Sequence, residues 1–118
     1  MTRKQKHADP IECPVEATLD IMGGKWKGVI LFRLIEGTKR FGELQRQMCK
    51  ITQRTLTNQL RQLEADGLIN RKVYAVVPPK VEYSLTAKGR SLSGLLTGLH
   101  DWGMENLIRP DPQSAKLD

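Results

Sequence analysis

The chain has 118 residues, of which 27% are charged and 39% hydrophobic, so we expect a single folded domain with a modest core, not a disordered chain. No apolar run approaches the roughly 20 residues of a membrane span, and the basic, polar segment Met1 to His7 does not resemble a secretory signal. These features predict a cytoplasmic protein that needs no membrane.

The net charge is +6 and the isoelectric point is near 9.6. This balance favours an anionic partner, and nucleic acid is the commonest, because cationic side chains that neutralise phosphates release condensed counterions. A basic but merely solvated surface is the alternative. The two cysteines, Cys13 and Cys49, are too few for a disulfide framework.

The first half of the chain predicts a basic arm followed by two helices. Residues 1–12 form the arm, and a first helix is expected over Pro14–Met22, because proline suits the first helical position. Gly23 and Gly24 end that helix. A second helix is predicted from Lys25 to Glu36, and it is so apolar around its circumference that it belongs in the middle of the domain.

A third helix, about Phe41 to Met48, precedes a fourth that Thr52 caps and that ends before Gly67. The fourth helix carries an apolar stripe at helical spacing, made of Leu56, Leu60 and Leu63. A second stripe of hydrogen-bond donors lies on the opposite face: Arg54, Thr57, Asn58 and Arg61.

Two strands follow, Ile69 to Val77 and Lys80 to Leu85, with a turn at Pro78–Pro79. Thr86 then caps a last helix from Ala87 to Leu107, and residues 108–118 read as a polar tail. One face of the last helix is apolar, and something must pack against it: Leu92, Leu95, Leu96, Leu99 and Trp102. We therefore predict a mainly α fold with a small β-hairpin over residues 13–107.

Helix, turn, helix and hairpin in this order are typical of a winged helix-turn-helix domain, which binds double-stranded DNA. In such a domain one helix presents donors to base edges while apolar contacts anchor its other side. Arg54 and Arg61 could each bind a guanine edge or hold phosphate. Asn58 matches adenine, and Gln53 could reach bases or backbone.

Basic residues of the hairpin and of the turn between helices predict further contacts with the DNA backbone. On the hairpin these are Arg71, Lys72 and Lys80, and near the turn they are Arg46 and Lys50. Taken alone, a polar helix face is usually just solvated, and basic residues on a hairpin usually protect its edge. The combination of both in the correct order favours DNA binding.

A set of short motifs supports this interpretation and covers the chain from Cys13 to about Leu107. They are Cys13-Pro14, Gly23-Gly24-Lys25-Trp26, Arg40-Phe41-Gly42-Glu43-Leu44, Leu56-Thr57 with Leu60, Leu63-Glu64-Ala65-Asp66-Gly67-Leu68-Ile69, Val81-Glu82-Tyr83-Ser84-Leu85-Thr86 and Trp102. Together they resemble the HxlR family of bacterial regulators, which are relatives of the MarR type. One departure is Cys49-Lys50, where the family often has Pro-Gly.

The resemblance implies a homodimer in which the first and last helices form most of the interface. It also implies a palindromic operator, with repression more common than activation. For a two-fold dimer the two recognition helices should lie about 34 Å apart, which is one turn of DNA.

Cys13 lies at or near the start of the first helix, where peptide N–H groups favour a thiolate. In some members of the family a cysteine at a similar position senses quinones, aldehydes or oxidants, so a small electrophile or oxidant is a candidate effector. Oxidation could join Cys13 to its own copy or to Cys49. Against sensing, Glu12 and Glu16 lie nearby, and a packed interface thiol is the alternative.

Three other interpretations remain open. An enzyme is disfavoured because no nucleophile–base pair or carboxylate cluster stands out, and no cofactor is expected. A metal sensor would have to use Cys13, Cys49, His7 and His100, whose spacings match no zinc pattern. A winged-helix module that binds only proteins is the third.

Overall fold

The computed structural model describes residues 13–48 and 50–108; the expected arm, Cys49 and residues 109–118 of the expected tail lie outside these ranges. The elements, in chain order, are α2 (Pro14–Met22), α3 (Lys27–Ile35), β1 (Lys39–Arg40), α4 (Phe41–Met48), α5 (Gln53–Ala65), β2 (Ile69–Tyr74), β3 (Lys80–Leu85), α6 (Ala87–Arg90) and α7 (Ser93–Asn106).

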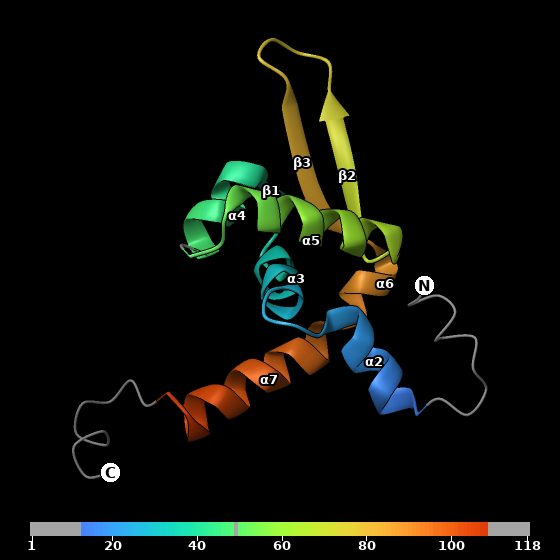
Figure 1. Cartoon of the computed structure of the whole chain (residues 1–118), viewed down its shortest axis with the longest axis vertical. Coiled ribbons are helices and arrows are strands. Elements are labelled where there is room, and N and C mark those ends of the chain that lie inside the picture. Colours follow the sequence, from blue (N-terminus) through green and yellow to red (C-terminus); the bar gives the residue numbers. More distant parts are fainter. Residues whose placement is uncertain (1–12, 49, 109–118) are drawn as a thin grey trace.

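Helix α3 lies in the middle of the molecule, as its apolar sequence predicts (Figure 1). Helices α4 and α5 and the hairpin lie on one side of it, while α2 and α7 lie on the other. Its side chains Ile30, Leu31 and Leu34 are at most 2% exposed. Because α3 contacts α2, α5, α7 and β3, it joins the two halves of the fold.

The sheet has three antiparallel strands in the order β1-β3-β2, whereas the sequence predicted only the hairpin. The additional strand pairs Lys39 with Tyr83 and Arg40 with Glu82. An ion pair of 3.1 Å between Lys39 Nζ and Glu36 Oε1 ties this strand to the end of α3, and it lowers the pKa of Glu36. Two residues are too short a run to show the alternation by which a strand is recognised.

Two predicted boundaries were wrong. The first strand of the hairpin ends at Tyr74, not at Val77, because the ladder closes where Tyr74 pairs with Lys80; Val77 is 99% exposed at the turn. Helix α3 begins at Lys27, not at Lys25, because Gly24 has a φ of +76° and residues 24–26 form a turn.

The single last helix predicted from Ala87 to Leu107 is interrupted at Ser91–Leu92, so α6 and α7 are separate. Ser91 and Ser93 donate side-chain hydrogen bonds to the carbonyls of Lys88 and Arg90. Serine hydroxyls that bind nearby carbonyls compete with helical hydrogen bonds and often bend a helix. The break allows α7 to pack on α3, where the rings of Phe32 and His100 stack with centroids 5.0 Å apart.

Helix α6 is held tightly against the start of β2. The Thr86 hydroxyl donates to the Gly67 carbonyl over 2.6 Å and accepts from the Gly89 peptide N–H over 3.0 Å. A Cβ atom on Gly89 would collide with the backbone carbonyl of Leu68 and lie 3.2 Å from Leu85 Cδ2. Only glycine fits between these two elements.

Gly89→Ala should therefore lower the free energy of unfolding by about 1–3 kcal/mol, because backbone must move to admit the methyl group. Gly42→Ala is the matched control, since its Cβ would meet only Arg46 Nη1 at 3.5 Å and alanine favours a helix. Chemical denaturation measures both variants. Equal unfolding midpoints for the two would contradict this packing.

Candidate nucleic-acid interface

Helix α5 has one buried face and one face of exposed polar side chains. Leu56, Leu60 and Leu63 are at most 2% exposed and pack into the core. The Thr52 side chain accepts a hydrogen bond from the Thr55 peptide N–H and so begins the helix where the sequence predicts. Burial of the leucines fixes which side of α5 faces solvent.

The solvent face of α5 carries the residues predicted to read bases. Gln53, Arg54, Asn58 and Arg61 are exposed, and Thr57 is half-buried. The Thr57 hydroxyl donates to the Gln53 carbonyl over 2.9 Å, so its hydrogen is already used within the helix. Four exposed donors remain on this face of α5, two guanidinium groups and two carboxamides.

The residues predicted to contact the DNA backbone lie on α4, in the turn before α5 and on the hairpin. Arg46 lies exposed in the last turn of α4, and Lys50 is exposed in the turn that precedes α5. The other three belong to the hairpin, which extends away from the helices beside α5 (Figure 1).

The hairpin residues divide between the two faces of the sheet, because neighbouring residues on a strand point to opposite sides. Arg71 pairs with the buried Tyr83 and shares its face. Lys72 pairs with Glu82, and Tyr74 pairs with Lys80, on the other face. The sequence grouped Arg71, Lys72 and Lys80 as one basic cluster, but the structure places Arg71 on the face opposite the two lysines.

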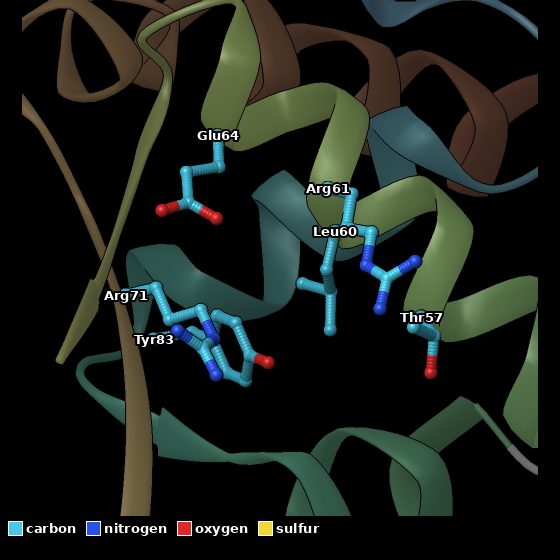
Figure 2. Close-up of a pocket in the computed structure, with 6 residues that line it drawn as sticks. All are labelled: Thr57, Leu60, Arg61, Glu64, Arg71 and Tyr83. Carbon is cyan, nitrogen blue, oxygen red and sulfur yellow. The ribbon is translucent and has the colours of Figure 1, made fainter. Parts of the chain in front are cut away.

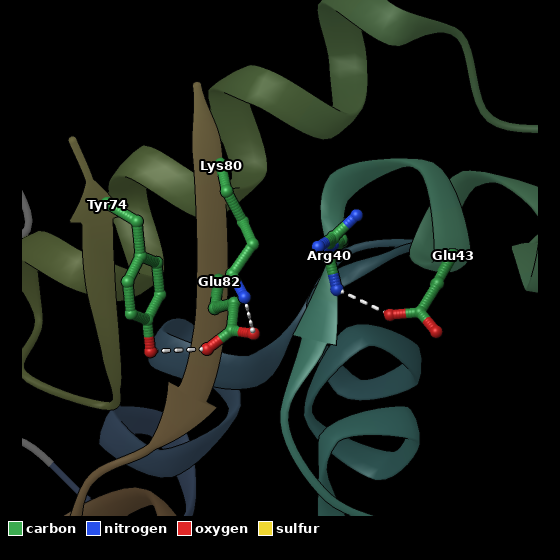
Figure 3. A network of polar contacts seen from close by, with 5 residues as sticks. All are labelled: Arg40, Glu43, Tyr74, Lys80 and Glu82. Atoms are coloured by element: carbon green, nitrogen blue, oxygen red, sulfur yellow. Dashed lines mark hydrogen bonds and ion pairs between the residues drawn. The ribbon is translucent and has the colours of Figure 1, made fainter. Parts of the chain in front are cut away.

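On the outer face, Glu82 and Tyr74 hold Lys80 in a polar network (Figure 3). The Tyr74 hydroxyl donates to Glu82 Oε1 over 2.8 Å, and Lys80 Nζ lies 3.7 Å from Glu82 Oε2. The ammonium groups of Lys72 and Lys80 lie 5.0 and 4.5 Å from the centroid of the Tyr74 ring. Glu82 therefore offsets part of the positive charge on this face.

Sequence reasoning missed Tyr74 and Glu82. The spacing of two residues already placed Lys80 and Glu82 on one face of their strand, and Lys72 and Tyr74 on one face of the other. The register that brings these two faces together is visible only in the structure. Glu43 was also missed: its carboxylate accepts a hydrogen bond of 2.8 Å from the Arg40 peptide N–H and begins α4 (Figure 3).

On the inner face, a recess of about 330 Å³ separates α5 from the hairpin (Figure 2). Its lining residues are Thr57, Leu60, Arg61, Glu64, Arg71 and Tyr83. The recess brings together Arg61 and Arg71, which the sequence assigned to separate surfaces. The structure thus places Arg61 on the side of α5 that faces the hairpin.

Away from this interface, α2 and α7 expose apolar side chains. Among the predicted dimer residues, Leu95, Leu99 and Trp102 are 47–59% exposed. Leu96 is only 3% exposed and lies in the core of the same chain, and Leu92 packs against that core. Helix α2 adds exposed residues that the sequence analysis did not select, Val15 and Leu19.

Cys13 is exposed immediately before α2, and its carbonyl accepts a hydrogen bond from the Ala17 peptide N–H. Cys49 and His7 lie outside the described residues. Over residues 13–48 and 50–108, no group of three or more metal-binding side chains comes together. No helix in that part of the chain is long and apolar enough to cross a membrane.

The sequence profile of the HxlR-like helix-turn-helix family matches residues 21–111. The HTH-type transcriptional regulator YdeP of Bacillus subtilis is 57% identical over 103 residues, which cover 87% of this chain and 80% of YdeP. The oxidized form of the redox regulator HypR superposes with a TM-score of 0.77 and 56% identity, covering 80% of this chain and 97% of HypR.

A transcriptional regulator of the MarR family from Porphyromonas gingivalis has a similar fold. It superposes with a TM-score of 0.79 and 39% identity, covering 84% of this chain and 97% of its own. The arrangement of α4, α5 and the hairpin is thus that of a winged helix-turn-helix regulator.

Proposed function

Because this chain belongs to the HxlR-like helix-turn-helix family of DNA-binding transcriptional regulators, we propose that it acts as a homodimeric repressor at a palindromic operator, with α5 as the recognition helix. The observation that carries this proposal is the two-sided character of α5. Its leucines are buried in the core, while its exposed face carries donors and no acidic group except Glu64 at the far end.

Arg54 and Asn58 are the side chains that we assign to base edges. They lie four residues apart, one turn along the same exposed face of α5. A guanidinium group can bind a guanine edge with two hydrogen bonds, and a carboxamide can do the same with adenine. Gln53 lies in the first turn of α5, at the same end of the helix as Arg54.

We assign Arg46, Lys50 and Lys72 to the DNA backbone. All three are exposed, and they flank α5 from α4, from the turn before it and from the hairpin. Contacts of this kind position a protein on the duplex without reading its sequence. Lys80 contributes less, because Glu82 offsets its charge.

Arg54→Ala should weaken binding to a duplex selected from genomic fragments by about 1–3 kcal/mol if Arg54 reads a base. Arg54→Lys is the matched variant, because it keeps the charge but loses the planar fork. We expect Arg54→Lys to lose affinity for the selected duplex and to keep affinity for an unrelated one. Fluorescence anisotropy at several salt concentrations measures both.

Unchanged affinity in both variants, with the fold intact, would show that the wrong face of α5 was chosen. Binding that does not weaken as salt rises would instead favour a module that contacts only proteins, because phosphate contacts depend steeply on salt.

The dimer is proposed to form through α2 and α7. A groove of about 340 Å³ between these helices is lined by apolar residues that include Val15, Leu19 and Leu99. A second groove of about 540 Å³ lies between α3 and α7. Contiguous apolar surface of this kind usually marks an interface, and a second copy would cover the same faces in return.

Leu99→Asp should shift the protein from dimer to monomer, because it places a charge in the proposed apolar contact. Val77→Asp is the control, since Val77 is equally apolar, 99% exposed and far along the hairpin. Sedimentation equilibrium gives the mass of each. A dimeric Leu99→Asp variant would contradict the assigned interface.

We propose that Cys13 makes the repressor responsive to an oxidant or a small electrophile. Its thiol is accessible and lies beside the proposed dimer face, and a relative is named a redox regulator. Modification at this position would alter the packing of α2 and so the spacing of the two recognition helices.

Treatment with diamide should release the wild-type protein from the selected duplex and leave Cys13→Ser bound. Cys49→Ser, run alongside on a non-reducing gel, separates a Cys13–Cys13 bridge from a Cys13–Cys49 bridge between subunits. Equal loss of binding by wild type and Cys13→Ser would exclude this role.

We propose no catalytic step for the chain, because the homologous proteins are regulators and the candidate surface is built for binding. A regulator that binds the chromosome works beside it, so we propose the cytoplasm as its compartment.

A further inference from the structure

We propose that the recess between α5 and β2 binds a single DNA backbone phosphate, held jointly by Arg61, Arg71 and the Tyr83 hydroxyl. This inference rests on the proposed function and adds to it a defined anion site. It also assigns Arg61 to the backbone, not to a base edge.

The recess gathers donors that have no partner in the described part of the chain. Over residues 13–48 and 50–108, no hydrogen bond or ion pair engages Arg61, Arg71 or the Tyr83 hydroxyl. Figure 2 shows Arg61 on the α5 side of the recess and Arg71 beside the Tyr83 ring on the sheet side, with the Tyr83 hydroxyl directed into the space between them.

Tyr83 is the strongest sign that the recess is a site. Its side chain is only 8% exposed, yet its hydroxyl opens into the recess and is not used by the fold. A hydroxyl that opens into the recess, with no hydrogen-bond partner among the described residues, remains available to donate to an acceptor supplied by a ligand.

The opposite face of the same hairpin shows the contrast. There Glu82 pairs with Lys80, and the Tyr74 ring lies against both lysines. On the inner face Arg61 and Arg71 line one recess, and Glu64, which also lines it, pairs with neither. Two cationic groups beside one recess that are not paired with a carboxylate favour an anion.

The ligand that fits is a phosphodiester. Guanidinium groups bind phosphate oxygens with two parallel hydrogen bonds. In a winged helix the recognition helix occupies the major groove and the hairpin lies against the neighbouring backbone. The space between these elements is therefore the place that the intervening strand of the duplex would occupy.

The test compares Arg61→Ala, Arg71→Ala and the double variant on the selected duplex, with the salt dependence of each. Loss of one phosphate contact reduces the slope of log affinity against log salt by about 0.9. Because both arginines hold the same phosphate, we expect the slope of the double variant to fall by about 0.9, as for the loss of one contact. We also expect the double variant to bind only about tenfold more weakly than wild type.

If the slope of the double variant falls by about twice that amount, and its loss of affinity is the product of the two single losses, the arginines bind two separate phosphates. If neither the slope nor the affinity falls, the recess does not contact DNA. Either result overturns the proposal. Lys88→Gln with Arg90→Gln removes the same charge from α6, away from the proposed DNA and dimer surfaces, and we expect little change in the slope. Tyr83→Phe keeps the core packing and should weaken binding a few-fold. Thermal melts check that each variant is folded.

Two further arms separate this inference from its alternatives. Titration of the free protein with inorganic phosphate should give no saturable binding; saturable binding that disappears in the double variant would assign the recess to a free anion instead.

If the wild type binds no duplex at all, the proposed function fails and this inference with it. If wild type and variants bind equally, only this inference fails.

Discussion

Three buried leucines determine which side of α5 faces solvent and is available to a partner. Leu56, Leu60 and Leu63 follow one side of α5 and are almost fully buried. Deleting a buried leucine side chain commonly costs about 2–5 kcal/mol, so α5 cannot rotate about its axis without losing much of the stability of a domain this size. Every donor on the exposed side therefore starts from a fixed position on the surface of the domain.

The hairpin adds a second constraint of the same kind. Its register is fixed by Ile69 and Leu85, which pair at its base and are both buried. From that pair outward, alternation assigns Arg71 to the face of Tyr83 and Lys72 to the face of Glu82. A shift of one residue would exchange these faces. The recess beside α5 and the partly neutralised outer face thus follow from two apolar side chains at the base of the hairpin.

Local patterns in the sequence were sufficient for most helices. Apolar spacing and the cap at Thr52 located α4 and α5, and Pro14 with Gly23 bounded α2. What the sequence did not reveal depends on contacts between distant segments. Strand β1 exists only because β3 pairs with it, and the direction that α7 takes after the break at Ser91–Leu92 depends on its packing against α3.

The same distinction holds for the candidate site. The exposed row on α5 was predicted from its period alone, since helical geometry places those residues together. The recess that Arg61 shares with Arg71 was not predicted, because the two residues lie ten positions apart in the sequence and only the packed position of the hairpin brings them to one recess. Leu96 was predicted to lie in the dimer interface but is buried in its own chain, because the position of α7 on α3 decides which leucines are covered.

The central claim is that α5, seated by its leucines, enters the major groove of DNA as one of a symmetric pair. A hydroxyl-radical footprint of the purified protein on fragments selected from genomic DNA tests it directly. The account predicts two protected half-sites related by two-fold symmetry, with centres about 34 Å, or one helical turn, apart. Failure to retain any duplex at low ionic strength, or a single protected patch without symmetry, would contradict it.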